Sequence, residues 1–379
     1  MKLRYTILVG LMAISAACEK GSVTYKDGQP IYLAASLPNN SQTKVPYDQA
    51  SPSQEKPLVV DVWASTTRNE FINKGYDGRT NGEGEVAIYT EGNFQSGTPQ
   101  LLSQAVYPPP RKGSSGNWTA DPVYFVAMHP QSKDGHSWIT PDDGNKGKQA
   151  IFTFTGCEDL MFAPEVSGAY DTEDQDEVVK NSPILKFEHL LTRFTVKMYI
   201  ELEEGENLLD VQDAWGNITD ISIKSYKDDY TYTENLNKAT IDLTKGADFN
   251  YGTDIKFSGS TDGAMQFYGI GTDASFPGTG GYTPTLQRDS LAYVMCAPVV
   301  ASTGDNTNEY YIAVETANRG TVELNLDLKK SNSEKYGGST RGKHFGIKII
   351  FKKGSAIATV ADILQWENGG IGIGDITDD

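Results

Sequence analysis

The sequence has few of the residues that most enzymes need for their chemistry. It contains three cysteines and four histidines in 379 residues. Cysteine catalysis and transition-metal sites need these residues in close groups, and no such group is present. We therefore predict no metal, no cofactor and no enzymatic activity.

Basic residues are also scarce: 33 Lys and Arg stand against 50 Asp and Glu, a net charge of −17. A surface of this sign repels phosphate backbones, so nucleic acid is excluded as a partner. After the first 20 residues no apolar run approaches the ~18 residues that cross a bilayer. Any membrane contact must then come from the N-terminus.

The N-terminus has the pattern of an export signal. Lys2 and Arg4 precede an apolar run, and Ser15-Ala16-Ala17-Cys18 resembles a bacterial lipobox. We predict that residues 1–17 are a signal peptide, that Cys18 is lipidated, and that the protein is held at the outer membrane and cell surface. An ordinary secretory signal with a chance cysteine is the alternative, because Ser15 stands where Leu, Val or Ile is usual.

Residues 18–56 are rich in Ser, Asn, Gln and Pro. With few apolar side chains to bury, this segment is predicted to be a tether or loosely packed arm.

From residue 57 onward the dominant pattern is the short apolar segment bounded by Gly, Asp, Asn or Pro. Such segments predict strands, and their spacing favours antiparallel β-sandwiches. The length fits two domains, which we place at 57–178 and 179–379. The predicted strands include Leu58–Trp63, Val86–Tyr89, Val123–Val126, Ile151–Phe154, Phe194–Ile200, Ile218–Ile223, Leu291–Val294, Tyr310–Val314, Val322–Leu326 and Phe345–Phe351.

The predicted joint between the domains is the acidic stretch 171–177. Five acids could attract calcium, but the stretch lacks the fixed offsets and central glycine of an EF-hand loop. We interpret it as a solvated loop.

Signatures of catalysis or phosphate binding are missing. The glycines of 370–374 precede no helix that could bind a phosphate. Glu188-His189 lacks the second histidine of a zinc protease, so we expect His189 to be packed or hydrogen-bonded. Cys157 and Cys296 could pair, but we expect buried free thiols.

Several phrases resemble one family. Asp159-Leu-Met-Phe-Ala163, then Leu185-Lys-Phe-Glu-His-Leu-Leu191, and finally the segment from His344 to Gly369 with its Trp366-Glu-Asn-Gly occur in the order found in fimbrillin-like proteins of Bacteroidetes. The region 69–110 has no clear counterpart. The resemblance covers most of the chain.

This resemblance implies a type V pilin-like subunit with two transthyretin-like β-sandwiches. Its partners would be other fimbrial subunits, and its role would be adhesion. In polymerising members a trypsin-like protease cuts after an Arg, a strand near the N-terminus leaves, and a donor strand from a neighbouring subunit fills the groove.

Carried onto this sequence, the removable strand is Leu58 to Trp63 and the cut follows Arg68, with Arg79 as the substitute. An uncut surface arginine is the alternative. The donor lies between residues 357 and 376, and a tail without structure is its alternative. The candidate donor residues are Ile357, Val360, Ile363, Ile371, Ile373 and Ile376.

A second hypothesis is a monomeric surface lipoprotein that binds glycans. Trp118 and Trp138 lie in polar, turn-rich contexts, where indole rings could stack on sugars or could cap the ends of a sandwich. Asp289-Ser290-Leu291 resembles an O-glycosylation acceptor in Bacteroides, with Ser290 as the modified residue. A non-polymerising anchor or tip subunit is a further alternative.

Overall fold

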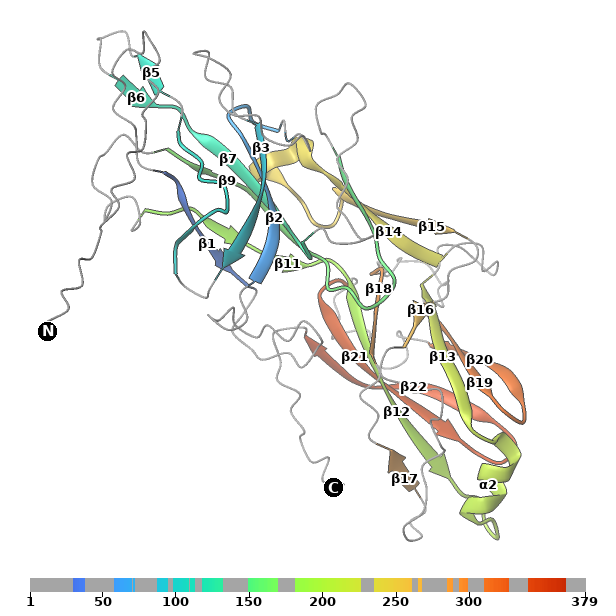
Figure 1. The fold of residues 1–379 in the computed structure, drawn as a ribbon. Coiled ribbons are helices and arrows are strands. Elements are labelled where there is room, and N and C mark those ends of the chain that lie inside the picture. The colour runs from blue at the N-terminus through green and yellow to red at the C-terminus, as the bar shows by residue number, and fades with distance from the viewer. Residues whose placement is uncertain are drawn as a thin grey trace, which may run out of the picture.

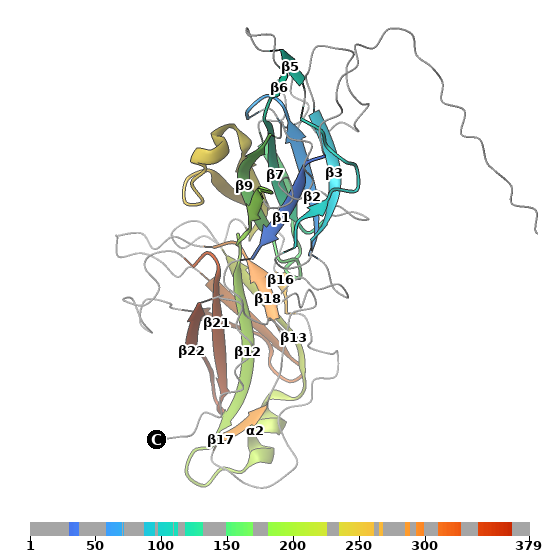
Figure 2. The same cartoon turned by 90° about the vertical axis from the view of Figure 1, so that its left-hand side faces the viewer.

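The computed structural model describes residues 30–37, 58–69, 71, 87–94, 98–108, 110–112, 118–131, 149–169, 181–225, 235–260, 265–267, 285–288, 293–298, 310–326 and 340–365. These residues form an elongated, mostly β molecule (Figure 1). The hairpin of β5 (Pro110–Lys112) and β6 (Trp118–Ala120) lies at one end and helix α2 (Leu208–Trp215) at the other, in both views (Figure 2). No helix in these ranges is long and apolar enough to cross a membrane.

The N-terminal half begins with two sheets packed face to face. A three-stranded sheet has the order β10 (Ile184–Lys186), β1 (Tyr32–Ser36), β4 (Gln100–Leu101). A five-stranded sheet has the order β11 (Glu188–His189), β9 (Met161–Gly168), β7 (Val123–His129), β2 (Leu58–Ser65), β3 (Ala87–Phe94). Apolar side chains from both sheets form one cluster between them, including Leu33, Val60, Phe125 and Leu185.

A third layer covers the other face of the five-stranded sheet. It consists of β8 (Gln149–Thr153), β14 (Asn235–Asp242) and β15 (Ile255–Ser260), with the 3-10 helix η1 (Leu243–Asp248) between β14 and β15. Trp63 and Met128 reach this side and join the core of the third layer. The layer explains why β2 is buried on both faces: side chains at alternate positions meet different sheets.

The C-terminal half is built from two further sheets. One has the order β17 (Thr285–Arg288), β12 (Thr192–Glu201), β21 (Lys343–Phe351), β22 (Ala356–Gln365), with β18 (Tyr293–Cys296) also paired to β12. The other has the order β16 (Met265–Gln266), β13 (Ile218–Ser225), β19 (Tyr310–Thr316), β20 (Gly320–Leu326). In β21 buried and half-exposed residues alternate, so one face lies in the core.

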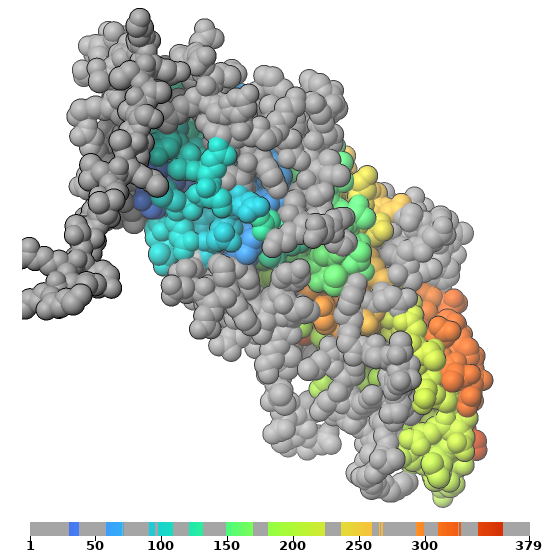
Figure 3. Space-filling model, in the orientation of Figure 1, coloured from blue at the N-terminus to red at the C-terminus, as the bar shows by residue number. Residues whose placement is uncertain are grey.

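The two halves share one continuous apolar core. The cluster that contains Trp63 and Phe152 in the third-layer region extends to Trp215 and Phe351 at the far end. In the space-filling view, the yellow surface of residues near β14 and β15 lies beside the green surface of the N-terminal half, although β14 follows β13 in sequence (Figure 3). The third layer therefore links the halves through burial as well as through the chain.

The all-β prediction is confirmed, and each of the ten predicted strands overlaps an observed one. Two details were wrong. Residues 30–37 were assigned to a loose arm but contain the buried strand β1, and β1–β10 and β12–β21 pair in parallel rather than antiparallel. Leu33, Ala34 and Ala35 are all buried, so β1 does not show the alternation of a half-exposed strand despite its polar flanking sequence.

Strand pairing also crosses the predicted division at residue 178. Strands β10 and β11 follow that point but pair with β1 and β9 of the first half. Strand β14 of the second half pairs with β8 of the first. The division into tandem domains stays a prediction.

Candidate assembly site

Strand β1 occupies a narrow place in the three-stranded sheet. It pairs in parallel with β10 through Ala34, Ala35 and Ser36, and antiparallel with β4 through Tyr32 and Leu33. Each partner thus contacts a different part of β1. Few ladder hydrogen bonds hold this strand, compared with the long strands of the sheet beneath it.

The inward side chains of β1 are fully or almost fully buried. Ile31 and Leu33 have no exposed surface and Ala35 has 5%. They join the same apolar cluster as Leu58 and Phe187, which come from the opposite sheet and from the segment after β10. We call the spaces that the side chains of Ile31 and Leu33 fill the two large pockets, and the space that Ala35 fills the small pocket.

Backbone hydrogen bonds fix the ends of β1. The N–H of Ile31 donates to the carbonyl of Val106 at 2.7 Å, and the N–H of Phe187 donates to the carbonyl of Ser36 at 2.9 Å. The surrounding segments therefore present donors and acceptors along the line that β1 follows. If β1 left, those groups would lose partners in a buried place, and a new strand would restore them.

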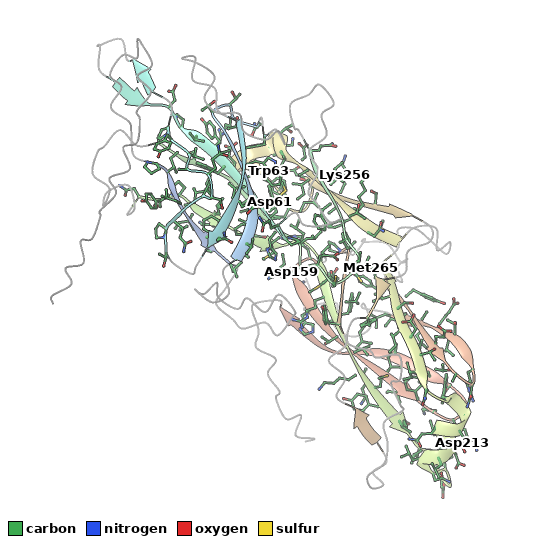
Figure 4. The ribbon with its side chains drawn as sticks, viewed as in Figure 1. Asp61, Trp63, Asp159, Asp213, Lys256 and Met265 are labelled. Atoms are coloured by element: carbon green, nitrogen blue, oxygen red, sulfur yellow. The ribbon has the colours of Figure 1, made fainter. Side chains whose placement is uncertain are left out.

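Strand β2 lies in a very different environment. All eight of its residues pair with β3, and the stretch Asp61 to Ser65 also pairs with β7. Trp63 lies at its centre with no exposed surface (Figure 4). Loss of Leu58 to Trp63 would split the five-stranded sheet and open both adjoining cores.

Arg68, the predicted cleavage residue, follows β2 in a turn and is bound to the protein surface. Its Nε donates to Oε1 of Glu165 at 2.6 Å, and its guanidinium lies 5.7 Å from the ring centroid of Tyr124. The Arg68 side chain is 54% exposed, but that of Glu165 is only 2% exposed. The Glu165 carboxylate raises the pKa of Arg68.

Strand β22, which contains three of the predicted donor residues, pairs with β21 along its length. It ends the order of its sheet. Ile357 is 46% exposed, an unusual degree for an isoleucine in a sheet. The side chains of Val360 and Ile363 lie outside the described residues, as do Ile371, Ile373 and Ile376 entirely.

The other predicted sites lie mostly outside the described ranges: Cys18, Arg79, Trp138, Ser290 and the acidic stretch 171–177. Trp118 begins β6, but its side chain is not described. These sites therefore stay predictions.

Both described cysteines are free thiols as predicted, but the prediction that both are buried is wrong for Cys157. Cys296 is buried, and burial raises the pKa of its thiol, whereas Cys157 is partly exposed. His189 is packed and hydrogen-bonded as predicted, with Nδ1 2.8 Å from Oδ1 of Asp159. Within the described ranges, no group of three or more His, Cys, Asp or Glu could hold a metal ion.

Strand β1 was not predicted from the sequence. Its signal was present as the apolar run Ile31-Tyr-Leu-Ala-Ala35, directly after Pro30. The run is short, and the polar residues on either side of it indicated a loosely packed arm instead of a strand.

Comparison with known proteins gives matches to solved structures alone. No family model matches the chain, and no curated protein does. One matching structure is a protein from Bacteroides uniformis that has been assigned to cell adhesion. It has TM-score 0.42 and 15% identity, and the match covers 89% of this chain and 98% of that one.

Two other matches are a fimbrial protein from Bacteroides vulgatus and a fimbrial assembly protein from Parabacteroides distasonis. The first has TM-score 0.41 and 11% identity and covers 89% of this chain and 99% of that one. The second has TM-score 0.40 and 8% identity and covers 89% and 98%. Each of these three matches covers 89% of this chain, at identities of 8% to 15%.

Proposed function

We propose that this protein is a non-enzymatic structural subunit of a cell-surface fimbrium, exported as a lipoprotein through Cys18 and assembled by strand complementation for adhesion. Its two halves would be tandem transthyretin-like sandwiches. Its partners would be further copies or other fimbrial subunits. The observation that carries the proposal is the short, apolar strand β1, seated between two edges with few ladder hydrogen bonds.

The removable strand in this proposal is β1, in place of Leu58 to Trp63. Removing β1 uncovers one groove and leaves the five-stranded sheet intact, whereas removing β2 breaks that sheet in two. The exposed groove would combine unpaired backbone groups with apolar pockets, which favours insertion of another strand.

A cut between β1 and β2 frees β1 alone. The basic residues in this interval are Lys44 and Lys56. Lys56 precedes Pro57, whose rigid ring hinders trypsin-like cleavage, so we favour the bond after Lys44. Cleavage after Arg68 or Arg79 remains the alternative that the resemblance suggests, and it would release β2 together with β1.

The C-terminal region is the proposed donor. Ile371 and Ile373 are two residues apart, as are Ile31 and Leu33, so both could fill the two large pockets. Gly372 lies between them as the partly exposed Tyr32 lies between Ile31 and Leu33. Strand β22 would supply the residues that precede this segment.

N-terminal sequencing and intact mass of protein sheared from native cells test the proposal, together with a gel run with and without heating. We expect chains that begin at Val45 and a heat-sensitive ladder of polymers. Deletion of residues 370–379 should abolish the ladder and leave the N-terminus unchanged. Lipidated Cys18 with no ladder would contradict a polymerising role and favour an anchor subunit or a monomeric binding protein.

A point substitution in the groove that β1 occupies distinguishes strand insertion from other kinds of association between subunits. Leu102→Asp places a charge in the cluster that receives Leu33 and should prevent polymer formation. Leu101→Asp is the matched control because Leu101 is 42% exposed and lies outside that cluster. If both variants polymerised like the natural chain, the groove that β1 occupies would not be the site of strand insertion.

A further inference from the structure

The turn between β21 and β22 is closed by its own backbone. The N–H of Lys352 donates to the carbonyl of Ser355 at 2.8 Å, and the N–H of Ser355 donates back to the carbonyl of Lys352 at 3.4 Å. Only Lys353 and Gly354 lie between them, so this is a tight two-residue hairpin. Strand β22 begins at the next residue, Ala356.

A side chain from the opposite sheet holds this turn. Arg319 lies in the turn between β19 and β20, and its guanidinium donates to the carbonyls of Gly354, at 3.1 Å, and of Lys353. Its Nε also donates to the carbonyl of Ala214 at the end of α2, at 3.2 Å. One arginine therefore connects α2 with the β21–β22 turn, at the end of the molecule where Figure 4 labels Asp213.

Trp215 completes this arrangement. The Arg319 guanidinium lies 4.5 Å from the indole centroid, and the indole Nε1–H donates to the carbonyl of Lys352 at 2.7 Å. Carbonyls of three successive residues, 352, 353 and 354, thus accept hydrogen bonds from two side chains that stack on each other. Carbonyls of an exposed hairpin turn ordinarily bond to water, so this turn has an additional attachment.

The attachment matters because, among the strands that the structure describes, β22 pairs with β21 alone. An edge strand can peel away from its neighbour if the turn that joins them opens. Arg319 bonds to that turn from the other sheet and resists such opening. The planar, charged guanidinium suits this task because it offers several donors in a fixed geometry.

We propose that Arg319 is a positioning residue that holds the β21–β22 turn against the opposite sheet and thereby limits the release of β22. This inference rests on the proposed function in one respect: the release of β22 would free the C-terminal region to act as a donor strand. The control of β22 opening itself is a property of the single subunit and can be measured there.

Hydrogen exchange followed by mass spectrometry on the monomeric chain 19–379 tests the inference. In Arg319→Ala, amides of residues 356–365 should exchange about tenfold faster, which corresponds to ~1.4 kcal/mol of lost protection. Amides of β12 and β13 should be unchanged. Arg319→Lys keeps the charge but not the fork of donors, and it should fall between the natural chain and Arg319→Ala.

Asn318→Ala is the matched control in the same turn. Asn318 Nδ2 donates to the carbonyl of Asp213 at 2.8 Å, so this variant loosens the contact with α2 but leaves the β21–β22 turn bound. We expect exchange of residues 356–365 to stay as in the natural chain. Equal acceleration in both variants, or acceleration spread over β12 and β13, would show that Arg319 has a general structural role and overturn the inference.

The strand-donation assay separates this inference from the proposed function. A labelled peptide of residues 356–379 competes with the subunit's own C-terminus for the groove left by β1. Faster exchange of β22 in Arg319→Ala, with no strand transfer in any variant, would support the role of Arg319 in holding the turn and refute assembly by strand complementation. Unchanged exchange of β22 in Arg319→Ala, together with normal strand transfer, would refute the role of Arg319 and support assembly by strand complementation.

Discussion

Nδ1 of His189 lies 2.8 Å from Oδ1 of Asp159, and both side chains are more than nine-tenths buried. Asp159 lies two residues before β9, and His189 ends β11, which pairs with β9. Close by, the N–H of Gly342 donates to the carbonyl of Leu191, so the start of β21 approaches the same place. This polar pair lies where the two halves of the molecule meet (Figure 4).

Asp159→Ala should lower the free energy of unfolding by about 3 kcal/mol, because it leaves the buried imidazole without its carboxylate partner. Urea unfolding followed by fluorescence measures the change. Asp213→Ala, at an exposed position of α2, is the control and should stay within about 0.5 kcal/mol of the natural chain. A loss of less than about 1 kcal/mol for Asp159→Ala would show that the pair contributes little.

The stability of the protein should fall as the pH drops below about 6.5, the ordinary pKa of histidine. Burial, with a smaller contribution from Arg193, lowers the pKa of His344 to about 3. Burial also lowers the pKa of His129. Between pH 6.5 and 3 the unfolded chain therefore binds protons at these histidines that the folded chain does not, and stability is lost on acidification.

His344→Gln tests this origin of the pH dependence. A glutamine amide can keep a hydrogen bond to Oγ1 of Thr195, which lies 2.9 Å from Nε2 of His344, but it does not titrate. Urea midpoints measured at pH 7.5 and pH 5 should differ less in the variant than in the natural chain. Equal differences would assign the acid sensitivity to carboxylates instead.

Gly246→Ala should be strongly destabilising, by more than about 2 kcal/mol. Gly246 has φ +51°, and a Cβ there would lie 2.4 Å from Oδ1 of Asn69 and 2.8 Å from Oε2 of Glu165. Gly205→Ala, with φ +85° and open space around it, should cost only the backbone strain of about 1 kcal/mol. Thermal unfolding of both variants measures the difference, and similar losses would mean that the turn after β2 yields easily.

Glu165→Ala should make the bond after Arg68 more sensitive to trypsin. The Arg68 guanidinium is paired with Glu165 and must leave it to enter the specificity pocket of a protease. Limited digestion with mass spectrometry should show this cut several-fold faster in the variant. Glu188→Ala removes the ion pair with Arg341 and should leave cleavage after Arg68 unchanged. Rapid cleavage after Arg68 in the natural chain would favour the alternative maturation site.

One thiol should react with a disulfide reagent in the folded chain 19–379 and two after denaturation. Cys157 is partly exposed, whereas Cys296 is buried and its raised pKa keeps it protonated. Absorbance of the released thiolate counts the reactive groups. Two rapid reactions in the folded state would mean that β18 opens readily.

The positions of most strands could be predicted from the sequence, because alternation and β-branched residues reflect burial on one face of a sheet. The pattern Phe345-Gly-Ile347-Lys-Ile349 is an example, and β21 is found there with its apolar side chains buried. Strand β1 was not predicted, since its few apolar residues gain their burial from sheets contributed by distant parts of the chain.

Contacts between side chains at the candidate sites could not be predicted in the same way. The pairing of Arg68 with Glu165 joins residues 97 positions apart, and Arg319 reaches carbonyls 34 and 35 positions away. Neither arginine differs from an ordinary surface arginine in its local sequence. Sequence decided the predominance of strands and the net negative charge, since these depend on local pattern and composition. Tertiary structure alone decided how few residues pair β1 with its neighbours and which side chains hold the β21–β22 turn, because both depend on which sheets meet.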